Sequence, residues 1–246
     1  KGEGQGVAFD EAQETYTARY TNETIALAFA ITEEAIEDNL YDRLASRYTK
    51  ALARSMSNAK EVKGAQPLNN GLPGVATFNS GDGVSLFNTA HTTISGTNVS
   101  NTLTTQADLN ETSLEAALID IAAFTDERGL RIAAKGVKMI IPSANQFNAE
   151  RLMKSQGRPG TADNDINAIN SMGMIPQGYR VNNFLTDADS WYIITDVPNG
   201  MKMFQRTPLT TSMEGDFDTG NVRYKARERY VFGVSDYRGI FGCEGA

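Results

Sequence analysis

Histidine and cysteine, which often carry catalysis or bind metals, are almost absent from this sequence. His91 is the single histidine and Cys243 the single cysteine. A Ser-His-Asp triad would have to use His91, and no nucleophile elbow accompanies it. One histidine and one cysteine cannot form a zinc site without several carboxylates. We therefore expect no catalytic residue, metal or cofactor; the alternative is an enzyme with its site in residues 65–110 and His91 as general acid or base.

The strongest charged pattern is a row of cations near the C-terminus. Within residues 221–234, Arg223, Lys225, Arg227 and Arg229 alternate with mostly apolar residues. Alternate residues share one face of a strand, so the pattern predicts a strand with one cationic and one apolar face. Like charges on one strand repel, which favours acidic groups opposite them from a neighbouring strand or subunit. A solvated sheet face explains the spacing equally well, and contact with DNA is a weaker third reading.

Composition is that of an ordinary globular protein. Of the 246 residues, 40% are hydrophobic and 22% are charged, which excludes disordered and collagen-like chains. The net charge of −7 argues against general affinity for nucleic acid, because neutralising phosphates requires an excess of Lys and Arg. No window approaches the roughly 18 consecutive apolar residues of a membrane span. Because the chain begins at Lys1 and not at Met, we expect a segment upstream of it.

Residues 7–31 predict two extended strands with a bend at residues 21–23. In the first strand, Tyr16 and Tyr20 alternate with polar residues that include Arg19. A terminal hairpin of this kind has no core of its own and needs a surface to lie on.

Residues 32–63 predict a long helix. Apolar residues recur every four positions from Ile36 to Met56, acids crowd the start, and Gly64 suits the end. At 3.6 residues per turn, a four-residue repeat drifts by about 40° per step, so its apolar stripe winds around the helix. More than one neighbour must cover such a stripe.

The remaining sequence predicts a long loop followed by mixed helices and strands. Residues 65–110 have loop composition, rich in Gly, Pro, Asn, Ser and Thr. Thr112 and Glu115 form a candidate capping box for a helix that ends by Gly129. The other expected elements are a strand at 137–141, a helix at 143–155, and strands at 191–195, 201–205 and 221–234.

This order of elements resembles that of the HK97-type major capsid proteins of tailed bacteriophages. Three segments are similar to those of Mu-like head subunits within that group: FAITEEAIEDNL at 29–40, LFNTAH at 86–91 and YVFGVSDYRG at 230–239. The resemblance implies an α+β fold with an extended E-loop hairpin, a long spine helix, a peripheral domain and an axial domain.

The resemblance also implies a division of the chain. Residues 1–31 would be the E-loop-like hairpin, which reaches over a neighbouring subunit. Residues 32–111 would be the peripheral domain with its spine helix at 32–63, residues 112–205 the axial domain, and residues 206–246 strands returning to the peripheral domain.

The implied function is that of a structural subunit of an icosahedral shell. Hexamers and pentamers of the chain would enclose double-stranded DNA, assembling in the bacterial cytoplasm and ending in the virion. Scaffolding, portal and decoration proteins are further expected partners, and a membrane is not. The alternatives are an encapsulin-like nanocompartment, a small adaptor and the enzyme above. The expected inter-subunit contacts are Tyr16, Arg19, Tyr20, Arg223, Lys225, Arg227 and Arg229.

Overall fold

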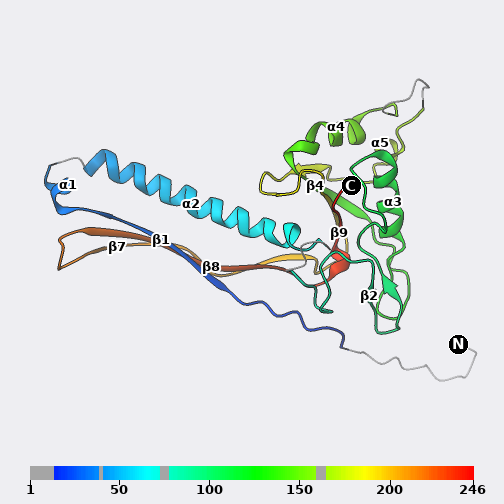
Figure 1. Ribbon diagram of the computed structural model, residues 1–246, viewed down its shortest axis with the longest axis horizontal. Helices are drawn as coiled ribbons and strands as arrows, with labels where there is room; N and C mark the ends of the chain where they lie inside the picture. Colours follow the sequence, from blue (N-terminus) through cyan, green and yellow to red (C-terminus); the bar gives the residue numbers. More distant parts are fainter. Residues whose placement is uncertain (1–13, 39–40, 73–77, 159–164) are drawn as a thin grey trace, which may run out of the picture.

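The chain folds into an extended arm and a broader body (Figure 1). The computed structural model describes residues 14–38, 41–72, 78–158 and 165–246. In the arm, one long helix lies along a three-stranded sheet, and the body combines a four-stranded sheet with the shorter helices. The architecture is therefore α+β, as predicted.

The sheet of the arm has the strand order β1-β8-β7, with both outer strands antiparallel to β8. Its strands are β1 (Glu23–Ile31), β7 (Met201–Gly215) and β8 (Val222–Val234). β8 matches the predicted strand at 221–234, whereas β7 continues far beyond the predicted 201–205. The backbone of β7 pairs with β8 along the arm. The polar sequence of β7 after residue 205 contains no sign of this pairing.

The prediction of two paired strands within residues 7–31 is wrong for the part that the structure describes. Residues 14–22 form no strand, and β1 pairs along its whole length with β8. The extended hairpin of the arm is formed by β7 and β8. A period-2 pattern identifies an extended segment but does not identify its partner, which here comes from near the C-terminus. Residues 7–13 of the prediction lie outside the described residues.

The predicted helix at 32–63 divides into α1 (Glu33–Glu37) and α2 (Tyr41–Asn69). Residues 39–40 lie outside the described residues. The prediction that Gly64 ends the helix is wrong, because α2 continues through it. A Cβ at Gly64 would lie 3.4 Å from Cζ of Phe232, so this glycine allows α2 to approach β8 closely.

One face of the sheet packs against α2. Leu52 and Met56 of the helix form a small core with Ala226 of β8, flanked by Ile25 and Phe29 of β1. The apolar face of β8 therefore lies on the helix. Its cationic face lies on the opposite side of the sheet, because alternate residues of a strand point in opposite directions.

The sheet of the body has the order β5-β4-β6-β9, with β4 and β5 parallel and the other pairs antiparallel. Burial of β6 and β9 on both faces makes their sequences continuously apolar. The predictions at 137–141, 143–155 and 191–195 are confirmed. The elements of the body are α3 (Glu111–Ala122), β4 (Gly136–Ile141), η1 (Ser143–Asn145), α4 (Gln146–Lys154), α5 (Ala168–Met172), β5 (Tyr179–Val181), β6 (Trp191–Thr195), η2 (Tyr237–Gly239) and β9 (Ile240–Cys243).

The predicted capping box of α3 is wrong by two residues. Asn110 and Ser113 form it: Asn110 Oδ1 accepts from the Ser113 amide at 2.9 Å, and Ser113 Oγ accepts from the Asn110 amide at 3.0 Å. The helix ends well before Gly129, which has φ +84° and serves a later turn. Both Asn and Thr are good N-caps, so the sequence left the choice between them open.

Residues 70–110 form the predicted loop, as far as the structure describes them, with two short strands, β2 (His91–Thr92) and β3 (Asn98–Val99). The loop is not loosely attached, because Leu86 and Phe87 are fully buried in the core of the body. No helix among the described residues is long and apolar enough to cross a membrane.

Candidate assembly surfaces

His91 lies in a hydrogen-bonded group inside the body, and its side chain is fully buried. Nδ1 lies 2.6 Å from Asp82 Oδ2, and Nε2 lies 3.1 Å from Asn101 Oδ1 and 3.2 Å from the Leu86 carbonyl oxygen. The imidazole stacks on the Tyr237 ring with the centroids 3.9 Å apart. Every polar partner of His91 is thus a neighbouring protein atom, as in a structural histidine.

Asn101 connects this group to the C-terminal segment. Its Nδ2 donates to the carbonyl oxygens of Leu86, Tyr237 and Ile240 at 2.8, 3.2 and 3.3 Å, and its Oδ1 accepts from the Asn88 amide at 2.9 Å. These bonds fix the orientation of the amide, so its oxygen faces Nε2 of the histidine. We call Asp82, His91 and Asn101 the loop latch, because they join the long loop to η2 and β9.

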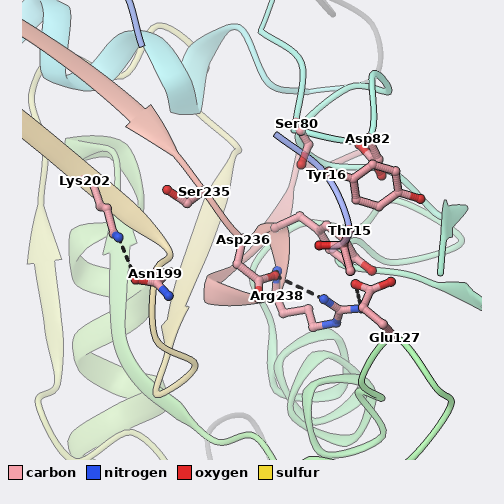
Figure 2. A pocket seen from close by; sticks show the side chains of 12 residues that line it. Thr15, Tyr16, Ser80, Asp82, Glu127, Asn199, Lys202, Ser235, Asp236 and Arg238 are labelled. Carbon is pink, nitrogen blue, oxygen red and sulfur yellow. Dashed lines mark hydrogen bonds and ion pairs between the residues drawn. The ribbon is translucent and has the colours of Figure 1, made fainter. Parts of the chain in front are cut away.

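A polar pocket of about 390 Å³ lies beside the loop latch (Figure 2). Its charged groups are paired within the chain. Arg238 Nη2 donates to Glu127 Oε1 at 2.7 Å, and Nε donates to the Thr125 carbonyl oxygen at 2.8 Å. Its third nitrogen, Nη1, lies 3.5 Å from Asp236 Oδ1. Lys202 donates to Asn199 at 2.6 Å. Groups engaged in this way offer no activated nucleophile with a base beside it.

No group of three or more potential metal ligands occurs among the residues that the structure describes. Cys243 is buried in β9, and burial raises the pKa of its thiol, which makes it a poor nucleophile. The pocket and the loop latch connect the long loop to the C-terminal segment of the fold.

The cationic face of β8, formed by Arg223, Lys225, Arg227 and Arg229, is the clearest charged surface. Arg223 forms an ion pair with Asp216 in the β7–β8 turn. Among the described residues, Lys225, Arg227 and Arg229 form no ion pair. The prediction of one cationic and one apolar face is confirmed by the burial pattern of the strand.

The two tyrosines among the predicted contact residues within 14–22 have partners in their own chain. The Tyr16 hydroxyl donates to the Thr92 carbonyl oxygen at 2.6 Å. The Tyr20 hydroxyl bonds to Oγ of Ser235, and its ring lies 4.8 Å from that of Phe204. Arg19 is exposed. Tyr16 therefore binds the long loop at β2, and Tyr20 binds the inner end of the arm's sheet.

Comparison with known proteins shows the family of this chain. The family model described as phage capsid protein matches residues 15–242. The chain belongs to the phage capsid protein family. It is a structural shell subunit of the virion that assembles with copies of itself, and neither the enzyme nor the nanocompartment alternative is favoured. No curated protein matches the chain.

Solved capsid structures share the fold of this capsid subunit. A chain of Mycobacterium phage Patience has a TM-score of 0.61 and 13% identity, over 98% of this chain and 77% of that one. The capsid of Myoviridae phage XM1 has a TM-score of 0.56 and 13% identity, over 92% of this chain and 74% of that one. The capsid of an empty GTA particle has a TM-score of 0.54 and 17% identity, over 99% of this chain and 81% of that one. The predicted HK97-type fold is confirmed.

The capsid subunit also exposes an apolar surface that sequence reasoning missed. Ile119 of α3 and Met172 of α5 border a shallow apolar pocket of about 270 Å³ and are 69% and 70% exposed. Ile166, just before α5, is 72% exposed. A signal was present in α3, where Ile119 adds an apolar residue outside the stripe that faces the core. Exposed apolar area of this kind marks protein contacts.

Gly233 of β8 allows residues 14–22 to lie against the sheet of the arm, because the Tyr20 ring lies directly over it. We expect Gly233→Val to displace Tyr20 and to release this segment, while the rest of the fold persists. Hydrogen exchange should then rise at residues 17–22 of the subunit and stay unchanged in α3. The control is Gly215→Val at the end of β7, at a glycine with nothing within 4 Å of an added Cβ and no positive φ. Unchanged exchange at residues 17–22 would contradict the contact.

Proposed function

We propose that this capsid subunit forms hexamers and pentamers that close into an icosahedral bacteriophage shell around double-stranded DNA. The proposal rests mainly on the sheet of the arm. One face of this sheet packs on α2, and the other face is open. A closed shell gives each subunit several neighbours that can cover such surfaces. Assembly in the host cytoplasm, with scaffolding, portal or decoration proteins as further partners, belongs to the same proposal.

The division into domains is also proposed. Contact of α2 with β1 and β8 supports a peripheral domain that contains residues 32–111 and 206–246. The four-stranded sheet and its helices support an axial domain at residues 112–205, although β9 joins that sheet from the C-terminal segment. The resemblance assigns the E-loop-like reach over a neighbour to residues 1–31. Because β1 belongs to the sheet of the arm, we assign this reach to the residues before Glu23.

Seven residues are proposed as inter-subunit contacts. On the cationic face of β8, Glu214 is the single acid among the residues paired with the four cations, which supports a contact there with another copy. Tyr16, Arg19 and Tyr20 belong to an extended segment with few bonds to the body, which supports its movement onto a neighbour during assembly. We propose no catalytic activity and no cofactor, because the charged groups around the pocket are paired.

Electron microscopy of the purified chain tests the proposal. We expect closed particles with icosahedral symmetry, because the exposed surfaces of the arm and body are buried only in a shell. Hexamers and pentamers should be visible as capsomers in averaged images. Nuclease-resistant double-stranded DNA in particles from infected cells would support the enclosed genome. A dispersed monomer at all concentrations, with any upstream segment restored, would refute shell formation.

A further inference from the structure

The cationic face of β8 lacks a matching row of acids on its own sheet. The strands on both sides are antiparallel to β8, so their paired residues share this face. The residues opposite the four cations are Thr24, Ala26, Ala28, Ala30, Thr207, Thr210, Ser212 and Glu214. Glu214, beside Arg223, is the single acid among them. Most neighbours are small, so the cations stand out from a flat surface that another molecule can approach.

Arg229, at the inner end of the row, differs from the exposed Lys225 and Arg227 in being half-buried. Nε of Arg229 is buried and has no hydrogen-bond partner. A buried donor without an acceptor is costly, and charged groups carry the largest cost. Its own chain already covers this atom, so a second copy would meet the exposed Lys225 and Arg227, which form no ion pair among the described residues.

A complementary acidic surface lies at the tip of the arm, on α1 (Figure 1). Glu33, Glu34, Glu37 and Asp38 are all exposed, and none forms an ion pair among the described residues. Their spacing places them on one side of the helix, whereas Ala35 and Ile36 between them are half-buried. Glu33 also touches Gly220 in the β7–β8 turn. Four carboxylates thus form one acidic side at the end of the molecule.

The two surfaces match in spacing as well as in charge. Cations two residues apart on a strand lie about 7 Å apart. Residues four apart on a helix lie about 6 Å apart, which gives the pairs Glu33 with Glu37 and Glu34 with Asp38 a similar separation. The chain continues from α1 into α2, which covers the opposite face of the sheet. The acids of one copy are therefore placed to meet the cations of another copy.

We propose that α1 of one capsid subunit docks its acidic side on the cationic face of β8 in a second copy. The inference rests on the proposed shell function and names the partner of that face. The two surfaces are different parts of the same chain, so the contact is heterologous: each copy donates one surface and receives the other. Such contacts close into rings or shells when the geometry allows, which fits a subunit that assembles with itself.

Reciprocal charge reversal tests the pairing in the full chain. Lys225→Glu with Arg227→Glu, and Glu34→Lys with Glu37→Lys, should each reduce the yield of particles at least tenfold, measured by sedimentation and electron microscopy. The variant that carries all four substitutions should recover most of the yield. Lys135→Glu with Arg180→Glu is the control, since it changes the net charge as the first variant does but lies on the body. Circular dichroism checks that each variant folds.

The outcomes separate this contact from the proposed function. The pairing would be overturned if the wild type formed particles and the folded variant with all four substitutions did not recover the particle yield. The shell function would remain intact. No particles from the wild type would overturn the shell function itself. Equal loss of particles in the body control would assign the effect to net charge and also overturn the pairing. If the β8 variant assembled normally but its particles retained less nucleic acid, the face would bind DNA, and the pairing would again fail. Should charge reversal prevent folding, Lys225→Gln with Arg227→Gln, which keeps polar side chains, replaces it, and its particle yield should still fall.

Discussion

Replacement of His91 by Ala should destabilise the unassembled subunit by about 3–4 kcal/mol. The change opens a cavity in the core and leaves Oδ2 of the nearly buried Asp82 carboxylate without its partner, while Asn101 Oδ1 keeps the Asn88 amide as its donor. Denaturant titration of subunits kept below the assembly concentration measures the loss as a lower midpoint with an unchanged slope. In thermal unfolding, the same change corresponds to a decrease of about 10 °C.

A neighbouring substitution provides the control for His91→Ala. Thr92 follows it in β2 but is exposed, and its hydroxyl bonds to Asn98 at the surface. Thr92→Ala should change the stability by less than about 0.5 kcal/mol. Equal stabilities of wild type and His91→Ala would contradict the loop latch. A His91→Ala subunit that folded and assembled normally but lost a turnover would restore the enzyme hypothesis.

The sequence predicted best those elements whose pattern reflects burial by local neighbours. The strands at 137–141 and 191–195 are mostly apolar because both of their faces are largely covered, and the structure confirms both. The cationic and apolar faces of β8 were predicted for a similar reason, since alternation alone assigns a residue to one side of a strand. In each of these segments, the local sequence contains the information that fixes the element.

The sequence failed where distant residues decide the structure. β1 was predicted as half of a local hairpin, but its partner is β8, and register between distant strands has no local signal. Gly64 was predicted as a helix end, although its role depends on Phe232. For the same reason, Asp82 and Asn101 were not recognised as partners of His91, because a loop places them together only when it folds.

Glu228 was also overlooked as a carboxylate on the apolar face of β8, where its side chain is 3% exposed. Lys60 of α2 pairs with it at 3.3 Å and lies over the Tyr230 ring, 5.2 Å from the centroid. Burial and the nearby charge of Glu228 raise the pKa of Tyr230 to about 12, so its hydroxyl stays neutral. A buried carboxylate on the helix-facing side is tolerated because Lys60 compensates its charge.

Lys60→Met should therefore destabilise the subunit by about 2–3 kcal/mol, since it strands a buried charge, with the loss reduced because Lys60 is partly exposed. The double variant Lys60→Met, Glu228→Gln removes both charges and should recover most of that stability. Lys63→Met is the matched control on the same helix. Its partner Glu23 is 59% exposed, so the loss should stay below about 1 kcal/mol. Denaturant titration of the wild type, Lys60→Met, Glu228→Gln and the double variant gives the coupling between Lys60 and Glu228 directly. Additive effects would show that Glu228 is not held by Lys60, and that the arm tolerates its charge for another reason.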